Sequence, residues 1–155
     1  FCTKPQGKED KKNLILFRGA HCYIIMNRYP YNNGHLMVVP YTHTDTITKL
    51  SDETILEMMQ QVNMCLEILQ EAMAPDGFNI GMNLGTSAGA GIKDHIHMHV
   101  VPRWAGDTNF MPVLGDTKVV VESCQQCYDR LKPLFDARSA AHVAQRNKTS
   151  DHKRE

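Results

Sequence analysis

The chain has 155 residues and a formal net charge of zero, and its length fits one domain with a hydrophobic core of its own. A neutral charge balance gives no electrostatic drive toward nucleic acid polymers or an anionic membrane, so we expect neither partner. No apolar run approaches the roughly 18 residues of a membrane span. No signal peptide is visible, although the chain starts at Phe1 without a methionine. Five scattered cysteines and nine methionines predict a reducing, cytoplasmic setting.

Three short apolar runs near the start of the chain predict strands. Residues 14–18 and 21–27 are separated by Gly19, which indicates a hairpin. The segment 29–34, Tyr-Pro-Tyr-Asn-Asn-Gly, has turn chemistry, because proline fixes φ and Asn-Gly tolerates positive φ. Residues 35–41 are then expected to form the third strand.

A long helix is predicted to start at Ser51, a suitable N-cap that is followed by two acidic residues in the first turn. Pro-Asp-Gly at 75–77 ends it. Apolar residues recur inside it at steps of three and four, which predicts one buried face. That face comprises Ile55, Met59, Val62, Leu66, Leu69 and Met73.

The second half of the chain alternates strands with loops. Residues 78–84 alternate apolar and polar side chains, as a strand does when one face is buried. The stretch 85–91, GTSAGAG, reads as a small-residue loop. Further strands are predicted over 95–103 and 117–122. With two helices among about five strands, the expected fold is α+β with a mostly antiparallel sheet.

The end of the chain is predicted to contain a second helix and a tail. The helix, expected over 123–134, holds Cys124 and Cys127, which we interpret as small residues on one helix face, since one CxxC pair is a weak metal or redox signal. After it the sequence loses its apolar periodicity. We therefore expect a domain over 1–135 and a polar, disordered tail over 136–155.

The stretch HIHMHVVPR at 95–103 places three histidines at every second position. Because side chains alternate across a strand, His95, His97 and His99 should share one face while the residues between them face the core. Three interpretations compete: surface histidines, a zinc site, or a nucleophilic imidazole whose neighbours contact phosphate. The small residues of 85–91 favour the third, because they let backbone N–H groups approach an anion.

Other polar residues near the triad point the same way. Lys93 and Arg103 are expected to add positive charge nearby. Asn27 and Asn83 offer amides that can fix a ribose or a phosphate. A zinc hydrolase would normally use a carboxylate as general base, and the adjacent Asp94 is expected to point to the opposite face.

Several motifs in order resemble the histidine triad (HIT) superfamily. HIHMHVV at 95–101 matches its His-φ-His-φ-His-φ-φ signature, NRYPYNNGHLMVVP at 27–40 resembles its upstream segment, and FNIGMNLGTSAGAG at 78–91 resembles its strand and loop before the triad. The resemblance runs from about Asn13 to about Leu131. It implies a HIT-like fold, a homodimer and a nucleotide substrate.

A narrower resemblance concerns the segment HMHVVPRWAGDTNFMPVLGDTKVV, which is similar to the branch of diadenosine tetraphosphate phosphorylases, near the dinucleoside polyphosphate hydrolases. Other branches often carry a glutamine just before the triad, where this chain has Ala90, Gly91 and Ile92. This departure favours the phosphorylase-like branch. A nucleoside phosphoramidate hydrolase, and a nucleotide-binding regulatory protein with little turnover, remain as alternatives.

The resemblance implies cleavage of a dinucleoside polyphosphate, such as diadenosine tetraphosphate, at its α-phosphate. His97 would be the nucleophile of a covalent nucleotidyl-histidine that water or phosphate then resolves. His99 would contact the phosphate and assist the leaving group, and His35 would orient the triad. His95 would support its neighbours' tautomers or bind a metal. No cofactor is required for this catalysis.

The resemblance also implies substrate-binding residues. Asn27 would bind the ribose, or could be a plain turn residue, and Asn83 would contact phosphate. The phosphate loop would be Ser87, Ala88, Gly89 and Gly91, and the base pocket would be walled by Ile25 and Met37. Trp104 follows the triad strand and could line the substrate site or a dimer seam.

A structural zinc is a further implication. Some family members bind zinc with an N-terminal CxxC, a histidine shortly after the GHLMVVP-like strand, and the first triad histidine. Cys2, His43 and His95 stand at three of those four places.

Overall fold

The computed structural model describes residues 1–108, 114–115 and 121–151, with side chains up to residue 140. Its centre is a five-stranded sheet in the order β1-β2-β3-β5-β4, in which every neighbouring pair is antiparallel. The strands are β1 Ile15–Arg18, β2 Cys22–Met26, β3 Leu36–Pro40, β4 Gly77–Gly81 and β5 Met98–Arg103. The predicted α+β fold with an antiparallel sheet is therefore confirmed.

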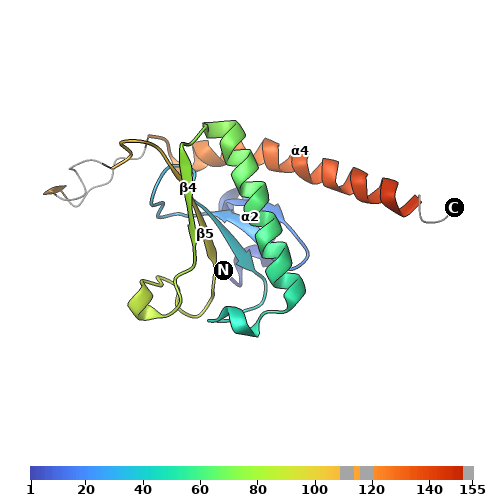
Figure 1. Cartoon of the computed structure of the whole chain (residues 1–155), viewed down its shortest axis with the longest axis horizontal. Helices are drawn as coiled ribbons and strands as arrows, with labels where there is room; N and C mark the ends of the chain where they lie inside the picture. Colours follow the sequence, from blue (N-terminus) through green and yellow to red (C-terminus); the bar gives the residue numbers. More distant parts are fainter. Residues whose placement is uncertain (109–113, 116–120, 152–155) are drawn as a thin grey trace.

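Three α-helices and three 3₁₀ turns with full bounds accompany the sheet, and the described residues 114–115 are also helical. The α-helices are α1 Asp10–Asn13, α2 Asp52–Met73 and α4 Cys124–Asp151, and the turns are η1 Lys4–Gln6, η2 Ile47–Lys49 and η3 Thr86–Ala88. Figure 1 shows α2 lying along the sheet, while α4 crosses above it and extends away. No helix of the described part is both long and apolar enough to cross a membrane.

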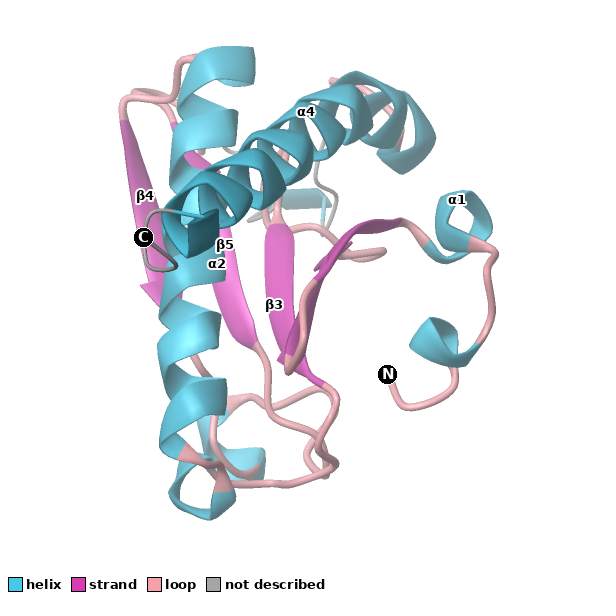
Figure 2. Ribbon diagram, turned by 90° about the vertical axis from the view of Figure 1, so that its right-hand side faces the viewer, coloured by secondary structure: helices cyan, strands magenta, loops and turns pink. Residues whose placement is uncertain are grey.

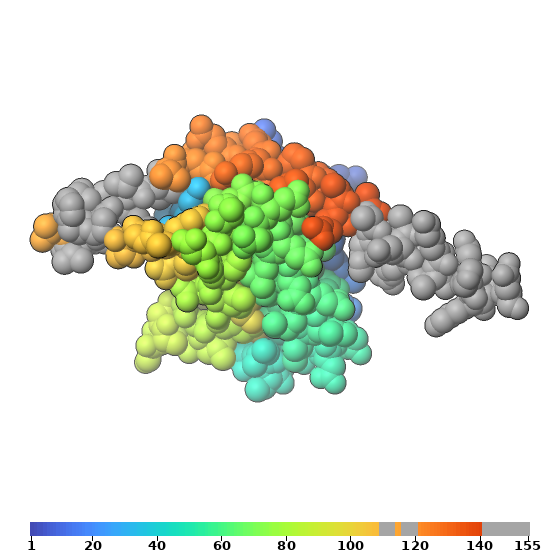
Figure 3. Space-filling view, turned by 45° about the horizontal axis from the view of Figure 1, so that its top comes forward, coloured from blue at the N-terminus to red at the C-terminus, as the bar shows by residue number. Residues whose placement is uncertain are grey.

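One face of the sheet forms the main core with the two long helices. Ile24, Leu36 and Val100 of the central strands lie in one buried cluster with Leu69 of α2 and Leu131 of α4. The helices also meet each other at the surface (Figure 3), where Arg138 of α4 forms an ion pair with Glu67 of α2. This apolar layer holds the sheet rigid from one side.

The other face of the sheet is also covered, by a different part of the chain. Ile15, Tyr23, Ile25, Met37 and Val39 form a second buried cluster against which Phe1 packs. Figure 2 shows the N-terminal segment and α1 at the margin opposite α2. As a result β2 and β3 are buried along their whole length on both faces.

Helix α2 begins as predicted, but its buried face is rotated from the expected one. The Ser51 side chain accepts a hydrogen bond from Thr54 N–H and caps the helix. Val62 and Leu69 are buried as expected, whereas Met59 is 45% exposed and Met58 is buried instead. Hydrophobic periodicity did not decide between these two faces, because Met58, Val62, Cys65 and Leu69 also recur at steps of three and four.

Polar contacts between α2 and the first hairpin come from Glu57 and Gln61. The Glu57 carboxylate accepts hydrogen bonds from the N–H groups of His21 and Cys22, and the Gln61 amide donates to the Cys22 carbonyl. A Cβ on Gly19 would lie 2.2 Å from the Glu57 carboxylate. A larger residue at this position would therefore displace the ends of the Glu57 and Gln61 side chains and disturb their hydrogen bonds to the hairpin.

Other expected boundaries also shift. Strand β4 ends at Gly81 rather than 84, and β5 begins at Met98 rather than 95. The helix expected to end near Leu134 continues to Asp151, so 136–151 is helical in the structure. The division into a domain ending at 135 and a tail stays a prediction.

The strand expected over 117–122 lies mostly outside the described residues. Its last two residues, Val121 and Glu122, form a bend.

Candidate active site

The three alternating histidines lie on the sheet face opposite the helices, and all three are buried. The exposed fractions of His95, His97 and His99 are 2%, 7% and 8%. Ile96 and Val100 point into the main core on the other face. The predicted alternation is thus confirmed even though β5 starts late, because the Ile96 N–H donates to the Thr44 carbonyl at 2.8 Å and holds the segment ahead of the strand.

His97 has its tautomer set by its own main chain. Its Nδ1 lies 3.0 Å from the His95 carbonyl oxygen. A carbonyl only accepts, so Nδ1 carries the hydrogen and Nε2 keeps its lone pair. Burial lowers the pKa of His97 below its ordinary value, which keeps the ring neutral near pH 7. A neutral imidazole with a free Nε2 lone pair is the form that acts as a nucleophile.

His99 is linked to His35 through a short hydrogen bond. His35 Nε2 and His99 Nδ1 lie 2.8 Å apart. His35 Nδ1 accepts from the Tyr31 backbone N–H at 3.0 Å, so its Nε2 carries the hydrogen and donates to His99 Nδ1. His99 is then left with an N–H at Nε2. Burial, with His97 nearby, lowers the pKa of His99 to about 4, so this ring is neutral as well.

That Nε2 group of His99 is buried and has no hydrogen-bond partner among the described residues. Buried polar groups in native proteins are almost always paired, so an unpaired one calls for an explanation. A donor here, next to a ring 4.6 Å away that presents a nucleophilic nitrogen, suits a ligand with acceptor oxygens. A phosphate has such oxygens.

Asn27 serves the turn before His35. Its Oδ1 accepts from the Tyr29 N–H at 3.0 Å, and its Nδ2 lies 3.4 Å from His35 Nδ1. This is the plainer of the two roles expected from the sequence. Contact with a ribose stays a prediction, and it would use the remaining Nδ2 hydrogen.

The expected phosphate loop is exposed, and some of its backbone N–H groups form hydrogen bonds within the loop. The N–H groups of Ala88 and Ala90 donate to the Gly85 carbonyl, and the Gly89 N–H donates to Thr86. Asn83 is half-buried before this loop. The structure therefore places the loop directly before the triad, but three of its N–H groups are already used.

Ile25 and Met37 lie on the histidine face, inside the second cluster, and Met37 pairs with His99 across β3 and β5. Phe1 lies over them and over His97, with 5.0 Å between the centroids of the Phe1 and His97 rings. Both Ile25 and Met37 are buried in this cluster, and their role in a base pocket stays a prediction.

Arg103 is not placed as expected. Its guanidinium binds the Asp107 carboxylate at 2.6 and 2.8 Å and the Asn79 side chain, at the far end of β5 from the triad. The expectation that Arg103 adds positive charge beside the histidines is therefore wrong. The reason is that four residues of extended strand separate Arg103 from His99 by roughly 13 Å.

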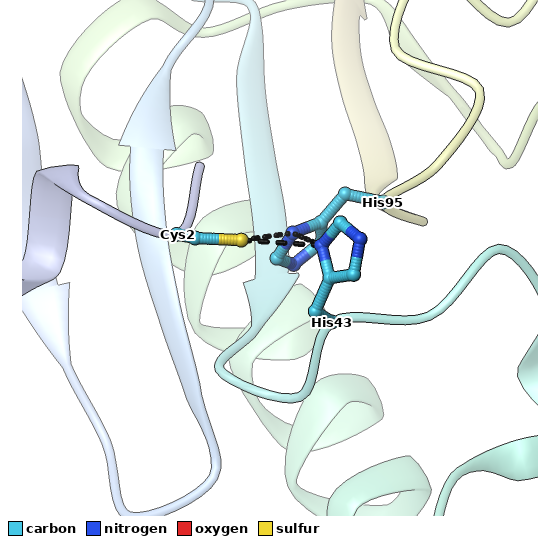
Figure 4. Close-up of side chains that lie close together, drawn as sticks. All are labelled: Cys2, His43 and His95. Atoms are coloured by element: carbon cyan, nitrogen blue, oxygen red, sulfur yellow. Dashed lines mark hydrogen bonds between the residues drawn. The ribbon is translucent and has the colours of Figure 1, made fainter.

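Cys2, His43 and His95 converge as the resemblance implied (Figure 4). The Cys2 sulfur lies 3.2 Å from His43 Nδ1 and 3.3 Å from His95 Nδ1, and the two nitrogens are 3.3 Å apart. Ligand atoms of a tetrahedral zinc site, with bonds of roughly 2.0–2.3 Å, lie roughly 3.3–3.6 Å from one another. The spacing of these three atoms fits zinc.

The surroundings of His95 also fit a metal ligand. Its Nε2 lies 2.9 Å from the Pro40 carbonyl, so Nε2 carries the hydrogen and the Nδ1 lone pair faces Cys2 and His43. A zinc ion held here would join the N-terminal segment to the loop after β3 and to the triad. It would act as a structural cross-link, because His97 and His99 are not among its ligands.

The cysteines of the second helix have a simpler role. Cys127 is buried and Cys124 is half-buried, and burial raises the pKa of the Cys127 thiol to about 12. Such a thiol is unreactive at neutral pH. The interpretation of this pair as packing residues agrees with the structure.

Some residues that shape the site escaped the sequence analysis. Tyr31 acts through its backbone N–H, which carries no side-chain signal. Asn32 and Asp107 join two segments that are far apart in the chain. The one signal in the sequence is the four-residue spacing of Arg103 and Asp107, which allows an ion pair between them.

Comparison with known proteins agrees with this geometry. A family model for the HIT domain matches residues 8–106. A protein of Mycobacterium tuberculosis named AP-4-A phosphorylase is 44% identical over 120 residues, which cover 77% of this chain and 61% of that protein. The chain thus spans about three fifths of that relative's length.

Two further relatives are informative. The adenosine 5'-monophosphoramidase hnt1 of Schizosaccharomyces pombe is 30% identical over 103 residues, covering 66% of this chain and 72% of that protein. The crystal structure of a Zn-bound histidine triad family protein from Mycobacterium smegmatis superposes with a TM-score of 0.67 at 26% identity, covering 83% of this chain and 88% of that one. The family match covers residues 8–106, and the antiparallel sheet carries the buried row of histidines. This chain therefore belongs to the histidine triad family, defined by the HIT domain.

Proposed function

We propose that the protein cleaves a dinucleoside polyphosphate, such as diadenosine tetraphosphate, by transferring a nucleotidyl group through His97. The observation that carries this proposal is the hydrogen bond from His97 Nδ1 to the His95 carbonyl, which leaves a lone pair on Nε2. The mycobacterial relative named AP-4-A phosphorylase supports the choice of substrate. An enzyme of this kind needs a nucleophile and a donor side by side, and the neighbouring His99 supplies the donor.

In the first step, His97 Nε2 attacks the α-phosphorus and forms a P–N bond while the bond to the bridging oxygen breaks. Diadenosine tetraphosphate would release ATP and leave AMP on the ring. The ring then carries a positive charge, which the Nδ1–H bond to the His95 carbonyl stabilises. ATP leaves as an anion, so a hydrogen bond from neutral His99 Nε2–H is enough to assist it.

In the second step, an acceptor oxygen attacks the same phosphorus and the P–N bond breaks, which returns His97 to its neutral form. Inorganic phosphate as acceptor gives ADP, and water gives AMP. We propose phosphate as the physiological acceptor, because of the similarity to the phosphorylase.

The same proposal assigns the substrate contacts. Asn27 would bind the ribose and Asn83 a phosphate oxygen. Ile25 and Met37 would form the floor under the base, and the phosphate loop would be Ser87, Ala88, Gly89 and Gly91. In the loop, a bound phosphate would have to use N–H groups other than those of 88–90, or compete with their internal bonds.

Product analysis tests the proposal. The protein is incubated with diadenosine tetraphosphate, with and without inorganic phosphate, and the products are separated by chromatography. ADP plus ATP appearing only with phosphate is the expected result. AMP plus ATP in both samples would mean that water is the acceptor. Absence of product in both would overturn the proposed substrate.

A second candidate is a nucleoside phosphoramidate hydrolase, which the named activity of the Schizosaccharomyces pombe relative favours. The same His97 would attack the phosphorus and expel an amine. Adenosine 5'-phosphoramidate, assayed beside diadenosine tetraphosphate, distinguishes the two. A higher kcat/KM for the phosphoramidate would favour this candidate.

We also propose a structural zinc held by Cys2, His43 and His95, on the strength of their spacing. We further propose a reducing, cytoplasmic setting, which the five scattered cysteines of the sequence support. The catalytic steps above use no metal.

We propose a homodimer that forms through the β4 edge. Strand β4 is the last strand of the sheet, and Ile80, Leu84 and Ile92 in and after it are 45%, 45% and 46% exposed. An open edge with apolar side chains is suited to pairing with a second copy. Light scattering of wild type and Ile80→Lys tests this: the variant should be monomeric.

A further inference from the structure

The loop between β2 and β3, residues 27–35, is tied to the end of β5 by one side chain. The Asn32 Nδ2 group donates to the Pro102 carbonyl at 3.0 Å and to the Asp107 carboxylate at 2.7 Å. Both hydrogens of that amide are thereby used. The neighbouring residue, Tyr31, supplies the backbone N–H that fixes the tautomer of His35.

Asp107 is itself held firmly. Two Arg103 nitrogens donate to its two carboxylate oxygens at 2.6 and 2.8 Å, and the Trp104 N–H donates at 3.2 Å. Its side chain is 9% exposed. Hydrogen bonding to Arg103 holds the pKa of this carboxyl well below its usual range, so Asp107 is an acceptor for Asn32 at all working pH values.

We infer that Asn32 and Asp107 are positioning residues of the active site, which hold the β2–β3 loop so that the Tyr31 N–H points at His35 Nδ1 and keeps His99 in its Nε2–H form. The Tyr31 donor is a main-chain group, so only the conformation of the loop can place it. The Tyr31 ring adds to this by packing on the rings of His35 and His99, at 4.7 and 5.4 Å between centroids.

The consequence follows from the direction of the hydrogen bonds. If Tyr31 N–H moves away, only the longer contact from Asn27 Nδ2, at 3.4 Å, still favours an acceptor at His35 Nδ1. A larger share of His35 then carries its hydrogen on Nδ1, and in that form His35 Nε2 is an acceptor. His99 Nδ1 then has to donate to His35 Nε2, so His99 carries its hydrogen on Nδ1 and has a lone pair at Nε2. A lone pair there would repel the phosphate oxygens that the Nε2–H attracts. The Asn32–Asp107 contact thus controls the Nε2–H donor of His99, although neither residue contacts that ring.

The tautomers can be measured without any enzyme assay. Long-range ¹H–¹⁵N spectra of the imidazole rings distinguish a protonated from an unprotonated nitrogen. In the wild type, both His35 and His99 should carry hydrogen on Nε2. In Asn32→Ala, the His99 signals should move toward a mixture of tautomers. A wild-type His99 protonated on Nδ1, or an Asn32→Ala spectrum identical to the wild type, would overturn the inference.

Kinetics supply the second readout, and this part rests on the proposed function. With diadenosine tetraphosphate and phosphate, Asn32→Ala should lower kcat about tenfold while KM changes less than twofold, because a donor to the transition state is weakened. Asn79→Ala is the matched control, since it removes a partner of the same Arg103 and leaves Asn32 and Asp107 in place. It should keep the wild-type kcat.

The two variants distinguish a positioning role of Asn32 from a general structural role. Equal losses in Asn32→Ala and Asn79→Ala, with unchanged tautomers, would mean a general structural role and would overturn the inference. If Asn32→Ala does not fold, the wild-type tautomers and those of Asp107→Asn still decide it. If no substrate turns over in any variant, the proposed function fails while the tautomer result stands on its own.

Discussion

The two faces of the sheet are both buried, yet they are built on different principles. The face under α2 and α4 is apolar, and residues such as Ile24 and Leu36 pack there without directional constraints. The opposite face mixes apolar residues with His35, His97 and His99, and the hydrogens of these rings are fixed by neighbouring N–H and carbonyl groups. Apolar packing is enough to build the first face, whereas the chemical properties of the second face depend on which ring nitrogen carries each hydrogen.

Adjacent residues of β2 show the difference at its smallest scale. Ile24 and Ile25 are both fully buried, but Ile24 belongs to the helix-covered core and Ile25 to the cluster below the histidines. A change on one face should affect stability, and a change on the other should also affect nucleotide handling.

The largest effect is expected for the nucleophile. His97→Ala should lower turnover by at least about a thousandfold, because it removes the only atom that can form the covalent intermediate, while nucleotide binding persists. Single-turnover assays and nucleotide titration measure the two separately. His21→Ala, at an exposed histidine, should leave both unchanged. A variant of His97 that keeps a tenth of kcat would rule out the covalent mechanism.

The second prediction compares the two isoleucines directly. Ile24→Ala and Ile25→Ala should each lower the free energy of unfolding by about 2–5 kcal/mol, since each leaves a cavity in a buried cluster. At a temperature where both variants are folded, only Ile25→Ala should also raise KM. Urea unfolding with steady-state kinetics checks this. Equal KM values would show that the two faces are not functionally distinct.

The third prediction concerns zinc on the histidine face. Metal analysis should find one zinc per chain in the wild type and none in Cys2→Ser, and zinc at a hundredfold above its Kd should add about 3 kcal/mol of stability. Cys124→Ser, at a half-buried thiol away from the site, is the control and should keep its zinc. Chelation should lower the melting temperature without abolishing turnover at a temperature where the chain stays folded.

The smallest expected effect is a pH dependence of stability. Burial lowers the pKa of His99 from its ordinary 6.5 to about 4, so between these values the unfolded chain binds a proton that the folded chain does not. The free energy of unfolding should therefore fall as pH drops from about 6.5 to about 4, by about 1–3 kcal/mol for this residue. Urea unfolding of wild type and His99→Gln measures it, and an equally steep fall in the variant would contradict the assignment.

How much the sequence foresaw differs between these regions. The strands of the first hairpin, the Ser51 cap and the shared face of the triad followed from local rules of period and capping. The exact face of α2 did not, because the sequence offers two neighbouring apolar series and the structure buries the one with Met58 rather than Met59, next to Glu57 and Gln61, which bind the hairpin. Polar anchors of this kind leave no mark in hydrophobic periodicity.

The sequence by itself determined the antiparallel α+β fold and the row of histidines, since these depend on residue spacing along one segment. The tertiary structure alone decided which nitrogen of His99 carries the hydrogen and which metal-binding atoms meet at His95. The His35–His99 hydrogen bond, the Asn32–Asp107 contact and the approach of Cys2 to His43 and His95 bring together segments far apart in the chain. Hydrogen-bond direction depends on atoms within about 3 Å, and only the folded chain brings those atoms that close.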